Sequence, residues 1–314
     1  MDIPDPGAPD VLEVLVAVEA VGINFPDVLI IADRYQRRPA RPFAPGGEFA
    51  GTVVAVGAGV QKFKAGDRVF GWCVSGALAE RLRLPAAECL HVPPGMPMDE
   101  AASLLMTYGT AHYALTRRGQ LRRGESVLVL GAAGGLGVAS IEIARAHGAG
   151  IIGAVSSMPK ADFVRDLGVD EVLIYPAGPL DRNAQRELAA QFKLATGGGC
   201  DLVADNVGGS YSEPALRCLN WGGRFLVMGF PAGIPAIPLN LPLLKSCQIV
   251  GVAFGAWLQR ERQAAARLVD ELLELYRDGR IRPRIQARFP LARGGDAIAQ
   301  LSERRAIGKI VVTI

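Results

Sequence analysis

A glycine-rich loop between a strand and a helix constrains the fold of this chain more than any other feature. The segment VLVLGAAGGLG spans residues 127–137. We expect a strand at 126–130, a loop at 131–137 and a helix at 138–147. The loop matches G-x-G-x-x-G with alanine in place of the first glycine. Gly134 lets the backbone approach a pyrophosphate, and Gly137 lets the helix lie close to the strand. We expect five loop residues to bind a dinucleotide: Ala133, Gly134, Gly135, Leu136 and Gly137. The alternative is a packing turn that binds nothing.

Strands and helices alternate after this loop, which is typical of an α/β fold with a doubly wound parallel sheet of the Rossmann type. Helices are expected at Lys160–Asp166 and Asn183–Ala195. Further strands are expected at Ile151–Val155, Val172–Ile174, Asp201–Asp205, Arg224–Met228 and Ile249–Phe254.

The first 90 residues and the last few predict a different architecture. Val11–Val21, Phe49–Val56 and Asp67–Trp72 are short Val-rich strands separated by glycine turns, a pattern that predicts a small β-barrel. Helices are expected at 99–117 and 262–276. The final segment, Lys309–Ile314, predicts a strand that rejoins the first domain.

Composition excludes several classes of protein. The chain has 314 residues, which favours two domains. Its 34 basic and 31 acidic residues leave a net charge of +3 without a basic block, so nucleic-acid binding gains no electrostatic support. Five scattered cysteines without a C-x-x-C pair indicate a reducing compartment. No apolar run reaches the roughly 18 residues of a membrane span, and we expect a cytoplasmic protein.

The end of the next strand indicates which nicotinamide nucleotide binds. An Asp or Glu there would bind the ribose 2′-hydroxyl and repel a 2′-phosphate. Instead the segment carries Ser156, Ser157 and Lys160 without an acid, and Tyr175 follows the third strand. Hydroxyl donors and a positive charge suit a phosphate. The sequence therefore predicts NADPH over NADH.

Several motifs together resemble one family. GINFPDVLIIADRYQ (22–36), PGGEFAGTVVAVGAGVQKFKAGDRVFG (45–71), AASLLMTYGTAHYAL (101–115), DLVADNVGG (201–209) and LNLPLLKSCQIVGVAFGAW (239–257) resemble the quinone oxidoreductases, or zeta-crystallin group. This group is a zinc-free branch of the medium-chain dehydrogenase/reductase superfamily. The resemblance implies a GroES-like β-barrel catalytic domain (1–98 and 260–314) around a Rossmann domain (99–259), with substrate between them. Members usually begin somewhat earlier, with an additional β-hairpin, so we expect an uncovered edge on the catalytic domain.

The resemblance also implies roles for individual residues. Lys160 and Tyr175 match positions that hold the 2′-phosphate, and Asn24 and Thr110 match positions near the nicotinamide. Further cofactor-binding positions are expected at Asn206, Val207, Gly229, Phe230, Phe254 and Gly255, at the carboxyl ends of later strands.

No metal site is expected. The first motif, Gly22–Phe25, lacks the cysteine that zinc relatives carry, no four-cysteine cluster exists, and His91, His112 and His147 are isolated in the sequence. Without zinc, polarising an alcohol is difficult, whereas hydride transfer to an acceptor that is already electrophilic is easier. We therefore expect a quinone or an α,β-unsaturated carbonyl as substrate.

Two residues are candidates for catalysis. Tyr35 matches the position where the enoyl reductase branch places its tyrosine proton donor, and a tyrosine of ordinary pKa stays protonated at neutral pH. The alternative is a tyrosine that packs the loop. Asn24 is expected to orient substrate or nicotinamide, with a turn cap beside Asp27 as the alternative.

Two other functions remain open. One is a reductase of enoyl thioesters on CoA or an acyl carrier protein, for which Arg34, Arg37, Arg38 and Arg41 would form a basic rim. The other is an NADPH-binding protein of low turnover. Whatever the function, the apolar strand Gln248–Phe254 predicts a homodimer, because an exposed apolar edge needs to be covered.

Overall fold

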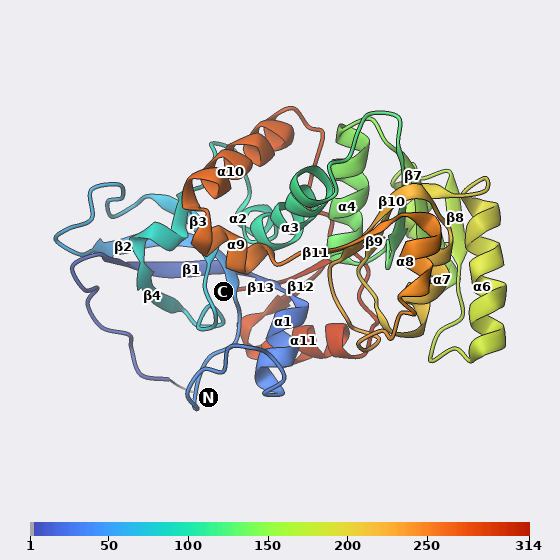
Figure 1. The fold of residues 1–314 in the computed structure, drawn as a ribbon. Helices are drawn as coiled ribbons and strands as arrows, with labels where there is room; N and C mark the ends of the chain where they lie inside the picture. The colour runs from blue at the N-terminus through green and yellow to red at the C-terminus, as the bar shows by residue number, and fades with distance from the viewer. Residues whose placement is uncertain (1–2) are drawn as a thin grey trace. The chain divides into compact units, whose positions relative to one another are not determined.

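The computed structural model describes residues 3–314, which divide into two compact units (Figure 1). One unit holds the described residues up to Met106 together with Pro283–Ile314, and the other holds Thr107–Arg282. The sequence predicted boundaries after residues 98 and 259. The segment 260–282 was therefore expected in the first domain, whereas it groups with the second unit. The limits of the domains stay a prediction.

The first unit is built on a seven-stranded sheet. Its hydrogen-bonded order is β12-β13-β1-β2-β3-β5, and β4 also pairs with β1. The strands are β1 (Glu13–Ile23), β2 (Glu48–Val56), β3 (Arg68–Trp72), β4 (Arg81–Pro85), β5 (Cys89–His91), β12 (Ile285–Pro290) and β13 (Lys309–Thr313). The helices are α1 (Phe25–Ile31), α2 (Met98–Ala101) and α11 (Gly294–Ser302).

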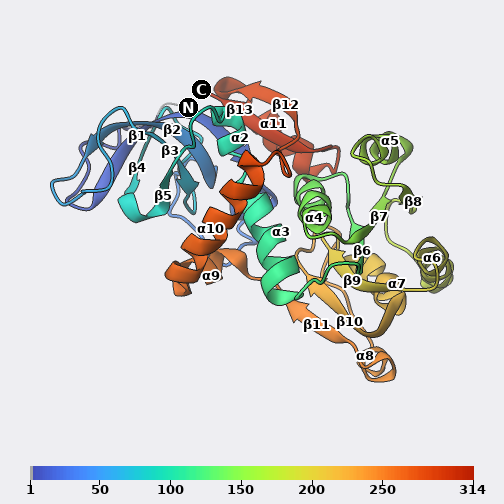
Figure 2. The ribbon, with the colours of Figure 1, turned by 90° about the horizontal axis from the view of Figure 1, so that it is seen from above.

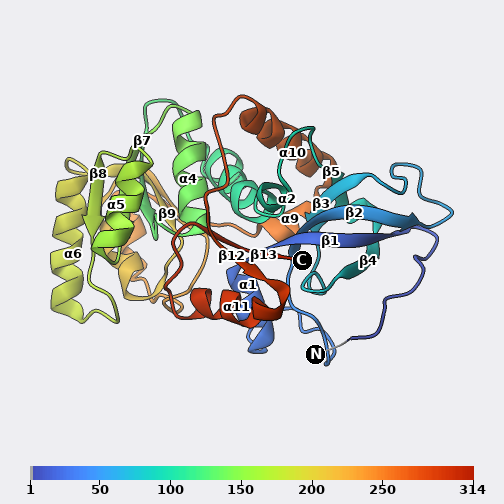
Figure 3. The same cartoon turned by 180° about the vertical axis from the view of Figure 1, so that it is seen from behind.

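Strand β1 organises this unit because three strands pair with it. Its first half pairs with β4, its second half with β13, and its other edge with β2. Val14, Val16 and Val18 are almost fully buried in the core. The antiparallel pairing of β1 with β13, visible in Figure 3, confirms that the final strand rejoins the first domain.

The second unit contains a six-stranded parallel sheet in the order β11-β10-β9-β6-β7-β8. Its strands are β6 (Ser126–Leu130), β7 (Gly150–Val155), β8 (Glu171–Ile174), β9 (Cys200–Asp205), β10 (Leu219–Val227) and β11 (Gln248–Gly251). The order runs outward in both directions from β6 and β9, which confirms the doubly wound arrangement. Central strand β6 is apolar on both faces, as expected for a sheet covered by helices on both sides.

Helices lie on both faces of this sheet. Figure 2 shows α4 and α5 on one face and α6, α7 and α8 on the other. The helices are α3 (Thr110–His112), α4 (Gly135–Ala146), α5 (Met158–Asp166), α6 (Arg182–Ala195), α7 (Ser212–Arg217), α8 (Asn240–Lys245), α9 (Phe254–Arg260) and α10 (Arg262–Arg277). The longest, α10, buries Ala265, Leu268, Val269 and Leu272 at the spacing of one helical face.

The continuous helix expected over 99–117 is interrupted. Helix α2 ends at Ala101, and a wide π-type turn begins at Leu105. Between them Ser103 donates from its hydroxyl to the Asp99 carbonyl oxygen (2.7 Å), a back-bond that bends helices. Wide turns recur from Tyr113 to Arg118.

The last strand of the parallel sheet is shorter than expected. Strand β11 ends at Gly251, and Phe254 opens helix α9 instead of ending a strand. β11 does lie at the edge of the sheet, with Ile249 40% exposed. The homodimer through this edge stays a prediction.

Helix α4 can lie against β6 only because position 137 lacks a side chain. A Cβ at Gly137 would stand 2.2 Å from the Gly131 carbonyl oxygen and 2.7 Å from backbone atoms of Ala132. We expect Gly137→Ala to lower the free energy of unfolding by roughly 2–3 kcal/mol, because backbone cannot move aside as a flexible side chain can. Urea denaturation measures the loss. Gly150→Ala is the matched control, since nothing lies within 4 Å of that Cβ position; an equal loss in both variants would contradict the packing argument.

Candidate functional site

The glycine loop turns the chain from β6 into α4 and leaves space beside it. Gly131 adopts a positive φ of 67°, which favours glycine. A Cβ at Gly134 would meet only the Gly131 carbonyl oxygen, at 3.6 Å, so the backbone there faces open space. Gly137 by contrast is packed against backbone. Gly134 therefore leaves open space beside the loop, and Gly137 allows the helix to pack on the strand, as the sequence predicted.

The N-termini of α4 and α5, like those of most helices in this unit, have no side-chain cap. Gly134 is the N-cap of α4 and Ser157 is the N-cap of α5, and neither helix has a side-chain cap hydrogen bond. The Ala132 N–H donates to the Ala154 carbonyl oxygen (3.1 Å), which ties the glycine loop to the end of β7. Uncapped N–H groups and the positive end of a helix dipole attract phosphate.

The residues expected to bind a 2′-phosphate follow β7 and β8. Ser156 and Ser157 are half-buried, and the Lys160 ammonium donates to the Ser156 hydroxyl at 3.4 Å. Tyr175 is only 5% exposed, and its ring lies 4.8 Å from that of Tyr211. The structure therefore pairs Lys160 with Ser156 and places Tyr175 mainly in the core.

A buried carboxylate shapes the loop after β9. One Asp205 oxygen accepts from the N–H groups of Val207 (2.9 Å) and Gly208 (2.8 Å), and the other accepts from the Ser212 hydroxyl (2.6 Å). Burial raises the pKa of Asp205, and these three hydrogen bonds oppose that rise. Asp205 thereby fixes the turn that presents Asn206.

Asn206 leaves an acceptor unused beside the glycine loop. Its amide nitrogen donates to the Leu130 carbonyl oxygen (3.0 Å), which fixes the orientation of the side chain. Its Oδ1 is buried and has no hydrogen-bond partner among residues 3–314. A Cβ at Gly131 would lie 2.9 Å from Val207 and 3.7 Å from Asn206, so these residues adjoin the loop. A buried acceptor without a protein donor is free to accept from a water or from a bound molecule.

The other expected cofactor residues lie in two places. Gly229 and Phe230 follow β10, where a Cβ at Gly208 would contact Phe230 at 3.1 Å, so they adjoin the Asn206 loop. Phe254 is buried and packs on Gly109, next to Thr110. Gly255 follows it in α9. Phe254 and Gly255 open α9 shortly after β11 ends at Gly251, just as Gly229 and Phe230 follow the end of β10 at Val227, and their role in cofactor binding stays a prediction.

These observations fit a phosphorylated nicotinamide nucleotide. The open backbone at Gly134 and the α4 N-terminus suit the pyrophosphate. Ser156, Ser157 and Lys160 offer donors and a positive charge without a carboxylate. The unused Asn206 Oδ1 suits a ribose hydroxyl, which can donate to it.

The first unit places Asn24 in a buried polar network. Its amide nitrogen donates to Glu48 Oε2 (2.9 Å) and to the Gly22 carbonyl oxygen (3.0 Å), and its Oδ1 accepts from Lys309 Nζ (2.7 Å). Its backbone N–H donates to Asp27 at 2.7 Å and caps α1. The turn cap that the sequence offered as an alternative is therefore present, and both polar atoms of the amide are engaged.

Glu48 and Lys309 form the centre of that network. Lys309 Nζ lies 2.8 Å from Glu48 Oε2, with the two side chains 4% and 0% exposed. The second Glu48 oxygen accepts from the Met106 N–H (2.8 Å). A Cβ at Gly22 would stand 2.9 Å from Glu48 Oε2, so glycine is needed there too.

Sequence reasoning missed both residues as functional candidates. Each is a charged residue at the start of an otherwise apolar strand, and that pattern was the available signal. A buried charge requires a partner of opposite sign, but the sequence does not say which.

Tyr35 lies in the loop after α1 and is half-buried. Burial raises the pKa of its phenol, the nearby Arg37 lowers it, and Asp27 raises it. The phenol therefore stays protonated at neutral pH, as a proton donor requires. Tyr35 belongs to the first unit.

Within residues 3–314, no group of three or more His, Cys, Asp or Glu side chains is arranged to hold a metal ion. His112 and His147, isolated in sequence, are adjacent in space with ring centroids 5.6 Å apart. Burial lowers the pKa of His112 to about 4. None of the helices in the described part of the chain combines the length and apolar character that a membrane crossing requires.

Comparisons with known proteins give a consistent result. Residues 10–94 match the alcohol dehydrogenase GroES-like domain, and residues 135–271 match the domain described as zinc-binding dehydrogenase. The quinone oxidoreductase-like protein 2 homolog of Nematostella vectensis is 36% identical over 304 residues, which cover 96% of this chain and 81% of the relative.

Solved structures are similar over nearly the full length. The Escherichia coli quinone oxidoreductase complexed with NADPH is 28% identical with a TM-score of 0.87, covering 100% of this chain and 95% of that chain. The CurK enoyl reductase is 27% identical with a TM-score of 0.84, covering 99% and 94%.

Asp27, which caps α1, makes the stability of the first unit depend on pH. Burial raises its pKa from 3.8 to about 6, while the Asn24 N–H and Lys309 oppose that rise. A raised pKa stabilises the fold at low pH, and this contribution is lost as the pH rises through about 6. Asp27→Asn cannot ionise, so its stability relative to the native chain should increase by roughly 2 kcal/mol between pH 4 and pH 7.

Urea denaturation of both proteins at several pH values measures this difference. Asp278→Asn, at an exposed carboxylate, serves as the control and should show no such trend. A difference between Asp27→Asn and the native chain that does not change with pH would contradict the buried, titrating carboxyl.

Proposed function

Because the chain belongs to the quinone oxidoreductase-like branch of the medium-chain dehydrogenase/reductase superfamily, we propose that it is an NADPH-dependent reductase of quinones or α,β-unsaturated carbonyls that works without a metal. The observation that carries the proposal is the unused Asn206 acceptor beside the open glycine loop. The NADPH named for the Escherichia coli structure supports the same cofactor here.

Residues of the second unit would hold the cofactor. The loop at Gly134–Gly137 and the α4 N-terminus bind the pyrophosphate, and Asn206 accepts from a ribose hydroxyl. Ser156, Ser157 and Lys160 bind the 2′-phosphate, with Tyr175 packed beside them. When bound, NADPH supplies the hydride.

Residues of the first unit would serve the acceptor. An acceptor that takes up a hydride develops negative charge on oxygen, and a hydrogen-bond donor stabilises that charge. We assign this donor, and the proton that an enoyl product needs at its α-carbon, to the protonated Tyr35 phenol. Asn24 orients the substrate or the nicotinamide, and hydrogen bonds to Glu48 and Lys309 hold its amide in one orientation.

Reduction of enoyl thioesters is the second candidate. The similarity to the CurK enoyl reductase favours it. Of the expected basic rim, Arg34 and Arg38 are exposed, while Arg41 donates to Asp33 (2.9 Å) and to the Ile31 carbonyl oxygen (2.8 Å). The rim therefore offers fewer uncommitted cations than the sequence suggested.

The proposal includes a cytoplasmic homodimer. The five cysteines are unpaired thiols, which supports a reducing compartment. At the β11 edge Ile249 is 40% exposed, and on the preceding helix Leu243 and Leu244 are 78% and 67% exposed. A second copy would cover this surface. Sedimentation at the mass of one chain would contradict the dimer.

Consumption of NADPH tests the activity. The purified protein is assayed by the loss of reduced-nucleotide absorbance with a quinone, an enone and an enoyl-CoA in turn. We expect turnover with at least one of the first two, because both are electrophilic without a metal. Preference for enoyl-CoA would favour the second candidate, and nucleotide binding without turnover on any acceptor would identify a low-turnover binding protein.

Lys160 should decide the choice between nucleotides. Lys160→Ala should raise KM for NADPH on the order of tenfold or more, since it removes a charge-assisted contact to the 2′-phosphate. KM for NADH, which has no such phosphate, should change little. Steady-state kinetics with both nucleotides gives the comparison, and equal effects would reject the assignment.

Tyr35→Phe should separate the two acceptor classes. Loss of the phenol should lower enoyl turnover roughly 100-fold, a typical contribution of a general acid. Quinone turnover should fall less, because solvent can protonate that product. NADPH affinity, measured by calorimetry, should be unchanged; unchanged enoyl turnover would remove Tyr35 from the mechanism.

A further inference from the structure

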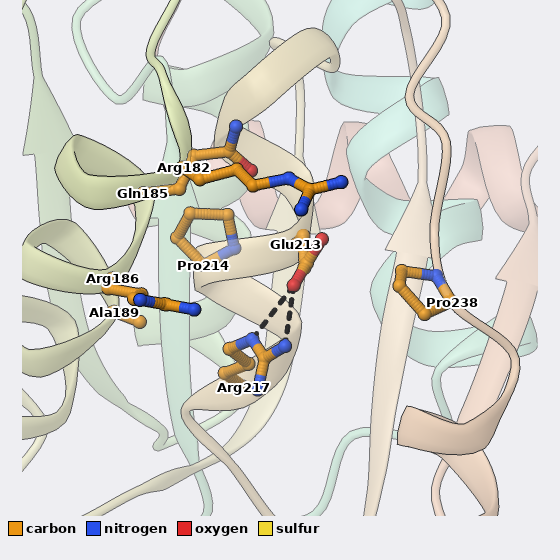
Figure 4. A pocket seen from close by; sticks show the side chains of 8 residues that line it. All are labelled: Arg182, Gln185, Arg186, Ala189, Glu213, Pro214, Arg217 and Pro238. Atoms are coloured by element: carbon orange, nitrogen blue, oxygen red, sulfur yellow. Dashed lines mark hydrogen bonds and ion pairs between the residues drawn. The ribbon is translucent and has the colours of Figure 1, made fainter.

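Three arginines from helices α6 and α7 lie close together. An open hollow of about 610 Å³ lies between these helices (Figure 4). It is lined by Arg182, Gln185, Arg186, Ala189, Glu213, Pro214, Arg217 and Pro238. All of these residues belong to the second unit.

Two of the three arginines have no ionic partner. Arg182 and Arg186 are exposed, and neither guanidinium group has a hydrogen bond or an ion pair with any residue between 3 and 314. Arg217 is held by Glu213, whose Oε1 accepts from two of its nitrogens at 2.6 and 2.9 Å. Three guanidinium groups thus face the hollow with one carboxylate among its lining residues.

One acid lies beside the pair, at the start of α6. The Asp181 carboxylate is engaged as the cap of α6, where it accepts from the Ala184 N–H (2.8 Å). Glu187, the next acid on α6, is exposed and does not line the hollow. The segment 231–239, which contributes Pro238 to the opposite wall, contains no charged residue.

The two arginines lie close together near the start of α6, whose N-cap is the Asp181 carboxylate. Arg182 and Arg186 stand four residues apart in the first half of the helix, and its first turn has no acidic residue. Like charges at this spacing repel each other, and cations oppose the positive end of the helix dipole. A bound anion lessens the repulsion between the two cations, and two guanidinium forks suit the oxygens of a phosphate.

We propose that this hollow is a binding site for an organic phosphate. The phosphate contacts Arg182 and Arg186, and the apolar part of the ligand lies against Pro214 and Pro238. The site is separate from the glycine loop, because α6 and α7 cover the face of the sheet opposite to α4 (Figure 2). It therefore does not depend on the proposed reductase function.

Phenyl phosphate is a suitable probe, because it joins one phosphate to one apolar ring. Calorimetry on the full chain should show saturable binding that is tighter than that of inorganic phosphate and that weakens with added salt. Arg182→Gln/Arg186→Gln should weaken binding on the order of tenfold or more, as expected for lost charge-assisted hydrogen bonds.

Two control variants identify the site. Arg267→Gln/Arg277→Gln removes the same charge from exposed positions on α10 and should leave binding unchanged. Lys160→Ala, beside the glycine loop, should also leave it unchanged. Equal weakening in both double variants would show an effect of net charge alone, and weakening only in Lys160→Ala would place the probe at the dinucleotide site; either result overturns the proposal, as does the absence of binding.

Discussion

An ion pair buried in the β-rich unit connects the two ends of the chain. Glu48 and Lys309 are separated by 261 positions, yet their side chains meet at 2.8 Å in a region closed to solvent. Removing one partner of such a pair typically costs about 3–5 kcal/mol, because the other charge stays buried. The same two side chains hold the amide of Asn24. The geometry of that motif thus depends on a residue from the final strand.

The parallel sheet contributes the other half of the proposed chemistry by different means. In the proposed cofactor site the backbone provides most of the surface, through the open loop at Gly134 and two helix N-termini. Side chains refine it: Asp205 fixes a turn, and that turn presents an amide whose oxygen lacks a donor. An arrangement of this kind is preorganised, because its groups are held in place before any ligand arrives.

Local pattern predicted the elements of the parallel sheet well, because a strand buried on both faces must be apolar along its length. Bounds for β6 agree with the structure at both ends. The prediction failed at Ser103, where a local hydrogen bond to the Asp99 carbonyl oxygen accompanies the interruption of a helix. It also failed at Phe254, which packs on the distant Gly109 and begins helix α9 instead of ending a strand. The Glu48–Lys309 pair could not be predicted, since nothing local specifies a partner so distant in sequence.

The pairing of β13 with β1 has a consequence for folding during synthesis. Thr107–Arg282 is a continuous segment, so every contact within that unit becomes available before the last part of the chain leaves the ribosome. The β-rich unit cannot complete its sheet until Lys309–Thr313 emerges, and until then Glu48 lacks its partner Lys309. The nascent chain thus passes through a stage in which one unit can be folded while the other still waits for its closing strand.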